Sequence, residues 1–465
     1  MKARDYGPLL AEMEESYARR YPRSAALNRQ ASKVLIDGGS HTLRLIQPFP
    51  PRIAAAQGAW LEDEDGHRIL DFWQGHLANI LGHNPEVVTL VLAQAFAAGM
   101  GLQTGFTERL QIETAEILCR QTGSEAVRFT TSGTLTTMYA ILLARAFTGR
   151  TLVMKVGGGW HGAQPWALKG IGFHGDNGGF QSVESAGVPA AVTDKVIVSG
   201  FNDPDALRAQ FRQIGDRLAC FIVEPFIGAG GFAPASREYL QTARDLTDRY
   251  GVVLVFDEVI SGFRFRAGNV GALYNVQPDL ATYGKIIGGG MPVSAVAGRR
   301  DILELAGRSA SKRVSFSGGT FSAHPASLLA AKTMLTYLTE HEAEIYPRLA
   351  QQGERSRQVL TSSFEQAGVP VTCTGHDPRV LPGSSIFMLH FPYDENSPLD
   401  RPQDWLNPSL CDTELGQRVF GLALLLEGVF MLHGHGAVST AHTESDIEFL
   451  SQACRRAVRR IKPFL

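Results

Sequence analysis

Between about Leu110 and Gly298, short apolar runs alternate with stretches of helical periodicity. Strands are predicted at 152–155, 195–198, 220–224 and 252–258. Between the last two, SREYLQTARDLTDRYG predicts a crossover helix, because Ser236 can cap its start and Gly251 its end. Almost wholly apolar strands separated by helices are typical of a mainly parallel sheet with helices on its faces. The chain is therefore predicted to have an α/β fold.

The segments on either side of this region predict a second, smaller unit. The first segment, up to about Gln30, has the periodicity of an amphipathic helix that ends around Tyr21-Pro22. GAWLEDEDGHRILDF predicts a hairpin that turns at Asp65-Gly66. After a Pro/Gly-rich stretch, an amphipathic helix is expected at 446–461. A chain of 465 residues exceeds what one core usually holds. We therefore expect an N-terminal part of the small domain (1–95), a large domain (96–330) and a C-terminal part of the small domain (331–465).

Composition excludes several classes of partner. The 44 basic and 46 acidic residues nearly balance, and no basic patch with interleaved aromatics suggests nucleic-acid binding. No apolar run approaches a membrane span, and the N-terminus is polar, so we expect neither membrane nor secretion. The five cysteines are scattered and form no C-x-x-C pair, which suits a reducing compartment. These features predict a cytoplasmic protein.

Two polar features stand out beside the predicted sheet. Asp257 and Glu258 end an apolar strand, where parallel sheets bind ligands, although such residues also meet solvent or cap helices. Lys285 lies in the glycine-dense loop YGKIIGGGMP. A lysine in apolar surroundings has a lowered pKa, and its neutral amine can react with aldehydes. The alternative is an ordinary lysine with an unshifted pKa on a flexible surface turn.

A third feature suits phosphate. RFTTSGTLTTMYAILL passes through Ser132, Gly133 and Thr134 into a helix, and helix starts favour anions, although any N-cap prefers such residues. A second Gly-Thr site lies at Gly319 and Thr320. A phosphate site, a strand-end acid and a buried lysine are the parts needed to hold pyridoxal 5′-phosphate (PLP). The acid keeps the pyridine nitrogen protonated, and the lysine carries the aldehyde carbon and later moves the proton.

The chain resembles a known family, the class III aminotransferases of PLP fold type I, and in particular the branch containing glutamate-1-semialdehyde 2,1-aminomutase. The similar pieces, in order along nearly the whole chain, are GAWLEDEDGHRILDF, LGHNPEV, TSGT, GGGWHG, FIVEPFIGAGG, LVFDEVISGFR, YGKIIGGGMPVSAVAGRRDI, SGGTFSAHP, LLLEGVFM and AHTESDI. The resemblance implies a mainly parallel seven-stranded sheet in a large domain, and a smaller α+β domain built from the N- and C-terminal segments.

The resemblance also implies roles for individual residues. Lys285 would hold PLP as a Schiff base, Asp257 would meet the pyridine nitrogen, and Val259 would pack on the ring face opposite the substrate. The phosphate would be held by Ser132, Gly133 and Thr134.

Five further residues follow from the same resemblance. Trp160, where the family usually has tyrosine, would stack on the ring, and Glu224 would lie near it. Thr320 would reach the phosphate in a neighbouring subunit, which implies a homodimer with shared active sites. His161 would be mainly a structural hydrogen-bonding residue. Arg44 falls where the aminomutase branch has an arginine that binds the substrate carboxylate.

The chain also departs from the family pattern. Leu135 and Thr136 replace the Glu-Ala that usually follows Ser-Gly-Thr, and Gly434 replaces a glutamate that helps close the aminomutase site. We therefore expect substrate contacts that differ from those of the aminomutase. His433 and His435 could line the pocket, but H-G-H is too short a pattern for a metal site, and we expect no metal.

These observations predict an aminotransferase that moves an amino group between a small, carboxylate-bearing donor (an α- or β-amino acid) and an oxo acid. A PLP-dependent isomerase, either an aminomutase or a racemase or epimerase, is the main alternative, and the need for an oxo-acid acceptor separates the two. A dinucleotide-binding protein is disfavoured because no G-x-G-x-x-G follows the first strand. A non-catalytic scaffold is disfavoured because Lys285 and Asp257 are both present.

Overall fold

The computed structural model describes residues 4–175, 178–396 and 399–465. Its largest sheet has seven strands in the order β4-β12-β11-β10-β7-β5-β6. Six strands run in one direction, and β12 is antiparallel to both of its neighbours, so the predicted mainly parallel α/β sheet is confirmed. The strand bounds are β4 (Ala126–Thr130), β5 (Leu152–Val156), β6 (Val196–Ser199), β7 (Leu218–Val223), β10 (Val253–Asp257), β11 (Leu280–Tyr283) and β12 (Ser294–Gly298).

Both faces of the central strands are buried, which explains why β7 is wholly apolar and β10 is apolar up to Asp257. Along β10, Val253 and Val255 belong to the core formed with α6 (Gly133–Thr148). Leu254 and Phe256 point the other way, into the core that includes side chains of α8 (Pro204–Ile214) and α9 (Arg237–Tyr250). This alternation follows from the two-residue period of a strand. The same alternation determines on which side of the sheet each residue at the end of β10 lies.

The crossover helix α9 begins and ends as its sequence predicts. The Ser236 hydroxyl accepts a hydrogen bond from the Tyr239 backbone N–H (3.1 Å). Gly251 has a φ of 61°, a left-handed conformation that glycine adopts without steric cost. The helix thus connects β7 to β10. It returns the chain to the end of the sheet at which β7 begins, so that β10 runs parallel to β7.

Segments from both ends of the chain form the smaller sheets. A four-stranded sheet has the order β1-β2-β3-β15, in which the predicted hairpin β2–β3 is antiparallel and β15 pairs parallel with β3. A second sheet has the order β13-β14-β16. The bounds are β1 (Ile53–Gln57), β2 (Trp60–Asp63), β3 (Arg68–Asp71), β13 (Thr372–Thr374), β14 (Ile386–His390), β15 (Val429–Phe430) and β16 (His435–Ala437), with a separate pair β8 (Phe226–Ile227) and β9 (Ala233–Pro234).

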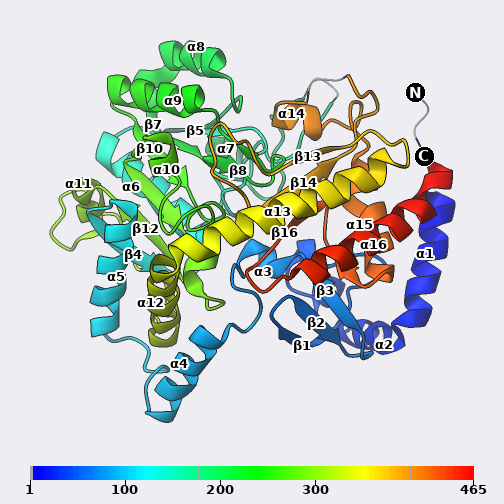
Figure 1. Ribbon diagram of the computed structural model, residues 1–465. Coiled ribbons are helices and arrows are strands. Elements are labelled where there is room, and N and C mark those ends of the chain that lie inside the picture. Colours follow the sequence, from blue (N-terminus) through cyan, green and yellow to red (C-terminus); the bar gives the residue numbers. More distant parts are fainter. Residues whose placement is uncertain (1–3, 176–177, 397–398) are drawn as a thin grey trace.

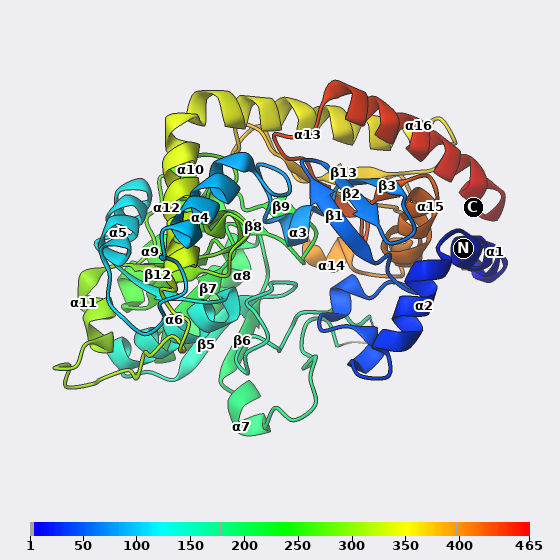
Figure 2. The ribbon, with the colours of Figure 1, turned by 90° about the horizontal axis from the view of Figure 1, so that it is seen from below.

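The terminal helices lie on the side of these smaller sheets (Figures 1 and 2). The predicted N-terminal helix is α1 (Gly7–Arg20), which buries Leu9, Leu10, Met13 and Tyr17. The C-terminal helix α16 (Glu444–Ile461) begins two residues before the predicted start, because Thr443 forms its capping box. It packs along α13 (Glu342–Glu365), the long helix that crosses the molecule in Figure 1. The division of the chain at residues 95 and 330 stays a prediction.

The remaining helices cover the sheets or connect these parts of the chain. They are α2 (Pro22–Ala31), α3 (Gln74–Leu77), α4 (Glu86–Ala97), α5 (Arg109–Thr122), α7 (Ala190–Thr193), α10 (Gly271–Tyr274), α11 (Arg300–Leu303), α12 (Pro325–Glu340), α13 (Glu342–Glu365), α14 (Pro402–Trp405) and α15 (Phe420–Leu426). Among the helices of the described ranges, none combines the length and the apolar character that a membrane span requires.

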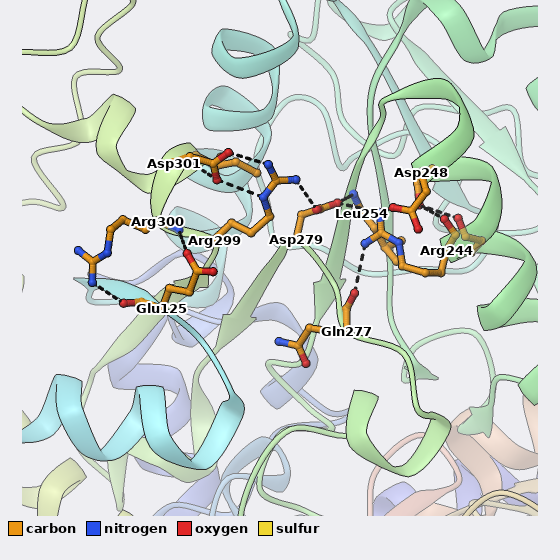
Figure 3. Close-up of polar contacts among 12 residues, drawn as sticks. Glu125, Arg244, Asp248, Leu254, Gln277, Asp279, Arg299, Arg300 and Asp301 are labelled. Carbon is orange, nitrogen blue, oxygen red and sulfur yellow. Dashed lines mark hydrogen bonds and ion pairs between the residues drawn. The ribbon is translucent and has the colours of Figure 1, made fainter.

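An ionic cluster holds the amino-terminal edge of the large sheet (Figure 3). Asp279 precedes β11, and its carboxylate accepts a hydrogen bond from the Leu254 backbone N–H (2.8 Å). The same carboxylate pairs with Arg244 at 3.1 Å and with Arg299 at 2.8 Å. Asp279 therefore ties together β10, β11, α9 and the end of β12. A cavity lies at the opposite end of the sheet, where β10 and β11 have their carboxyl ends.

Candidate active site

A cavity of about 530 Å³ lies at the carboxyl ends of β10 and β11, beside the first turn of α6. Asp257 ends β10, Lys285 follows β11, and Gly133 begins α6. The residues that line the cavity are Gly75, Ala78, Asn79, Thr131, Ser132, Gly133, Thr134, Thr137, Trp160, His161, Gly162, Glu224, Asp257, Val259, Ile260, Lys285, Gly290, Met291, Pro292, Val293 and Ser294. The fold thus brings together nine of the residues singled out by the sequence, from Ser132 to Lys285.

Lys285 is held in a strained conformation inside this cavity. Its φ is 47°, a left-handed value that is unfavourable for a residue with a side chain. Burial lowers the pKa of Lys285, while the negative charges of Asp257 and Glu224 act in the opposite direction. A lysine with a lowered pKa is neutral more often near neutral pH than an ordinary lysine. Its amine can therefore attack an aldehyde carbon or accept a proton.

Asp257 is a buried carboxylate with three hydrogen-bond donors. His161 Nδ1 lies 2.8 Å from Asp257 Oδ2. The Thr282 hydroxyl donates to Asp257 Oδ1 at 2.8 Å, and the Val259 backbone N–H donates to the same oxygen at 3.2 Å. Because Oδ2 accepts only one of these bonds, it keeps acceptor capacity for a cationic N–H in the cavity.

His161 is neutral in this arrangement. Burial lowers the pKa of His161, although Asp257 opposes the shift. A neutral imidazole at this distance donates its Nδ1–H to the carboxylate, and Nε2 has no partner among the described residues. The structural hydrogen bond that the sequence suggests for His161 is thus made to Asp257.

The first turn of α6 forms one wall of the cavity. The Ser132 hydroxyl accepts a hydrogen bond from the Leu135 backbone N–H at 3.4 Å, so Ser132 is the N-cap. A side chain at Gly133 would come within 3.1 Å of Val259 Cγ1, so this position suits only glycine without rearrangement. The first N–H groups of a helix have no helical acceptor and carry partial positive charge. This wall can therefore bind a phosphate group.

The loop that carries Trp160 is fixed from two sides. The Trp160 backbone N–H donates to Glu224 Oε1 at 2.8 Å, and Gly228 N–H donates to Glu224 Oε2 at 3.0 Å. Burial and the nearby charge of Asp257 raise the pKa of Glu224 to about 8. Glu224 thus lines the cavity and orients the loop, while Trp160, at the cavity wall, is 39% exposed.

A second buried lysine, Lys155 in β5, supports the same loop. Its Nζ donates to the carbonyl oxygens of Gly159 (2.9 Å), Ala167 (3.1 Å) and Lys169 (2.8 Å). Burial lowers the pKa of Lys155 to about 7. All three N–H donors of its ammonium group are used by these carbonyls, and Lys155 does not line the cavity. Its contacts are those of a structural lysine.

Asp257 and Glu258 have different surroundings although they are adjacent. By strand alternation, Asp257 lies on the same side of the sheet as Val253 and Val255. Glu258 lies on the other side, with Leu254 and Phe256. Glu258 Oε2 accepts a hydrogen bond from the Val270 backbone N–H at 2.7 Å, and Oε1 has no partner among the described residues. Burial raises the pKa of Glu258 to about 8. Only Asp257 of the pair lines the cavity.

Arg44 lines a second, larger cavity. This cavity has a volume of about 1010 Å³ and shares Gly75 with the first one. Arg44 Nε donates a hydrogen bond to His76 Nε2 at 3.0 Å. Because Gly75 lines both cavities, they lie side by side. Thr320 is exposed and lies outside both cavities of this chain.

Several lining residues are missing from the site that the sequence predicts. Met291 and Pro292 lie in the same loop as Lys285, and Thr137 lies one helical turn after Gly133, so proximity in sequence could have suggested them. Gly75 and Asn79 come from a segment near the small sheet, and only the fold brings them here. Within the described residues, no group of His, Cys, Asp or Glu side chains could hold a metal ion, and this includes His433 and His435.

Comparison with known proteins defines the class of this site. The family model for aminotransferase class-III matches residues 46–370, so the chain belongs to the class III aminotransferases. It is a PLP-dependent enzyme with the PLP fold type I architecture, and members of the family act on small amino and oxo compounds.

Three similar proteins illustrate the range of the family. Glutamate-1-semialdehyde 2,1-aminomutase from Haloarcula marismortui is 32% identical, over 94% of this chain and 100% of that protein. A crystal structure of an omega-transaminase from Sphaerobacter thermophilus is also 32% identical, with a TM-score of 0.84, over 94% of this chain and 97% of that one. A transaminase with PLP bound is 28% identical, with a TM-score of 0.83, over 95% and 98% of the two chains.

The cavity fits this cofactor. It offers an amine of lowered pKa, a buried carboxylate with remaining acceptor capacity, and a helix start with free N–H groups. The glycine at the start of α6 leaves space that a side chain would fill. These are the groups that an aldehyde, a pyridine nitrogen and a phosphate respectively require.

Replacing Glu258 with glutamine should reduce the pH dependence of stability. Glutamate titrates near 4.3 in an unfolded chain, and the pKa of buried Glu258 is about 8. The protonated form is therefore favoured in the folded protein. Its stabilising contribution is complete below the unfolded pKa and is lost as the pH rises toward about 8. Glu258→Gln should thus lose less unfolding free energy between about pH 5 and about pH 8 than the wild type.

Denaturant unfolding at both pH values measures this difference. Part of the dependence should remain in the variant, because burial also raises the pKa of Glu224 to about 8. An unchanged pH dependence in Glu258→Gln would mean that Glu258 is ionised in the folded protein at neutral pH.

Proposed function

We propose that this protein is an aminotransferase that transfers an amino group from a carboxylate-bearing donor, an α- or β-amino acid, to an oxo acid. The observation that carries the proposal is the position of Lys285 and Asp257 in one cavity that opens beside the cavity containing Arg44. The first pair suits PLP chemistry, and Arg44 suits a substrate carboxylate.

The proposed roles in holding PLP follow from the lining of the cavity. Ser132, Gly133 and Thr134 would bind the phosphate at the start of α6. Asp257 would hold the proton on the pyridine nitrogen, with its carboxylate oriented by His161 and Thr282. Val259 and Trp160 would contact the ring, and Glu224 would hold the Trp160 loop in place.

Lys285 is proposed as the catalytic residue that bonds to the cofactor and moves the proton. When bound, PLP supplies an aldehyde carbon that receives the amino group and a ring that accepts the electron pair released at Cα. The donor amine would first displace Lys285 Nζ from the cofactor carbon, and the freed Nζ, with its lowered pKa, would take the proton from the donor Cα and return it on the cofactor side. Water would then release the donor's carbon skeleton as an oxo acid. The oxo acceptor would then receive the amino group by the reverse sequence.

Arg44 is proposed to bind the substrate carboxylate. Its Nε is used by His76, so the two terminal nitrogens of the guanidinium group are left for a ligand. The ion pairs found within the described ranges all join other residues, so the charge of Arg44 remains available. A two-point contact with a carboxylate would orient the donor and select the C–H bond that breaks.

A PLP-dependent isomerase is the second candidate, supported by the similarity of the whole chain to glutamate-1-semialdehyde 2,1-aminomutase. Gly434 argues for the aminotransferase. It has a φ of 72°, and a side chain there would approach the Gly416 carbonyl oxygen at 3.2 Å. The acid that helps close the aminomutase site is thus missing from a position that suits glycine.

The absorption spectrum of the holoenzyme tests the choice between these functions. We expect a carboxylate-bearing donor to convert the visible PLP band to the pyridoxamine form, and pyruvate or 2-oxoglutarate to restore it. Lys285→Ala, the control, should stay folded and lose turnover by at least a factor of about 10³, because the proton has no carrier. If one amino acid lost optical purity or moved its amino group without any oxo acid, the isomerase would be correct.

We also propose that the protein works as a homodimer in which Thr320 reaches the phosphate site of the second subunit. Thr320 is exposed, next to the exposed ring of Phe321. Leu102 (75% exposed) and Phe106 (72% exposed) form another exposed apolar segment, and the backbone bond from Ala326 N–H to the Gly101 carbonyl (3.2 Å) brings the two segments together. Exposed apolar side chains on two neighbouring segments are typical of an interface.

A charged substitution in this surface should separate the subunits. Phe106→Asp should give the mass of one chain by size exclusion with light scattering, and should bind PLP more weakly. Phe147→Asp, an exposed phenylalanine at the end of α6, is the matched control and should remain dimeric. Thr320→Val should stay dimeric but bind PLP about tenfold more weakly, by the loss of one charged hydrogen bond. A wild type with the mass of one chain would contradict the proposal.

A further inference from the structure

The short helix α3 is left-handed. Gln74, Gly75, His76 and Leu77 have φ values of 44°, 60°, 60° and 68°, so four consecutive residues lie in the left-handed region. Only one of them is glycine, and each of the others is disfavoured there by contact between Cβ and the backbone. Such strain persists only where the surroundings impose it, and it is concentrated at functional sites.

Buried polar groups impose this conformation from both ends. Asp71 accepts hydrogen bonds from the backbone N–H of Trp73 (2.7 Å) and of Gln74 (2.9 Å). His83 Nε2 lies 2.7 Å from the same carboxylate and fixes it. At the other end, the buried guanidinium of Arg264 donates to the Leu77 carbonyl oxygen. The turn is thus held rigidly between β3 and the loop that follows β10.

The turn places His76 where the two cavities meet. Gly75 lines both cavities, and His76 lines the one that contains Arg44. The His76 ring contacts the rings of His41 and Trp73, each with a centroid distance of 4.4 Å. Its Nε2 accepts the hydrogen bond from Arg44 Nε at 3.0 Å. Arg44 itself lies in a short 3-10 helix, Thr42–Arg44, on an exposed segment, so His76 provides a fixed contact for a long and otherwise exposed side chain.

His76 can accept this bond only as a neutral imidazole with its proton on Nδ1. Burial lowers the pKa of His76 to about 3, and the charges of His41, Arg44, Lys285 and His435 act in the same direction. The ring therefore stays neutral at every pH at which the enzyme would work. An acceptor at Nε2 engages one edge of the guanidinium group and directs its terminal nitrogens away from His76.

We propose that His76 is a positioning residue that makes the enzyme select carboxylate-bearing substrates, by holding Arg44 through its Nε. This inference rests on the proposed role of Arg44 in binding the substrate carboxylate. The strained turn, the ring contacts and the hydrogen bond together place the acceptor. The selectivity thus depends on a residue that does not touch the carboxylate.

Calorimetry of the holoenzyme with two non-reacting ligands tests the proposal. 3-Phenylpropanoate carries a carboxylate, and 3-phenylpropanamide has the same shape without the charge. The wild type should bind the carboxylate more tightly, and Arg44→Gln should abolish this preference. His76→Phe keeps an aromatic ring against Trp73 and His41 but removes the acceptor, and should reduce the preference about tenfold. His76→Gln, which restores an acceptor oxygen, should recover most of it.

Three further results keep the two proposals distinguishable. Binding of the amide should change little in any variant, and the PLP absorption band should confirm an intact cavity. The double variant Arg44→Gln/His76→Phe should match Arg44→Gln alone, because His76 acts through Arg44. If the wild type showed no preference, the proposed role of Arg44 would fail. A preference lost in Arg44→Gln but unchanged in His76→Phe would overturn the role of His76 alone.

Discussion

The Asp257 carboxylate is buried at the end of β10, a strand with both faces covered, and the rest of the site depends on it. Asp257 is only 4% exposed, so its charge has exchanged water for the donors of His161, Thr282 and Val259. An ionised carboxylate persists in such surroundings only when it is well hydrogen-bonded. Burial is the main cause of the raised pKa of Glu224 and of the lowered pKa of Lys285. The negative charge of Asp257 adds to the first shift and opposes the second, so it tunes the protonation of both neighbours.

The scaffold keeps these groups in place by concentrating rigid contacts around the cavity. Asp279 holds the far edge of the sheet, and Lys155 fixes the loop of Trp160 and His161 through three carbonyl groups. Lys285 and the turn 74–77 both adopt left-handed backbone conformations, and Lys285 and Gly75 of that turn both line the cavity. Backbone strain at these two places, and buried polar braces beside them, are consistent with a site organised before the substrate arrives.

Local sequence patterns predict much of this arrangement. The strand that ends at Asp257, the helix that starts at Ser132 and the glycine-rich loop of Lys285 each have a recognisable signal, because period, caps and turns act over a few residues. The antiparallel β12, the left-handed turn around His76 and the burial of Lys155 have none. The turn, for example, depends on Arg264, which is 187 residues from Leu77 in the sequence. The separate roles of Asp257 and Glu258 follow from strand alternation only once both faces of the sheet are known to be buried.

The most direct measurement is to treat the holoenzyme with borohydride, which would make a bond between the cofactor and its lysine permanent, and to locate the modified peptide by mass spectrometry. The chain offers a strong internal comparison, because Lys155 and Lys285 both have a pKa lowered by burial. Lys285 lines the cavity with Asp257, whereas the ammonium of Lys155 is fully engaged by backbone carbonyls. Modification of Lys285 alone is the predicted result. Modification of Lys155, or of any other lysine in place of Lys285, would contradict the assignment of this cavity as the PLP site.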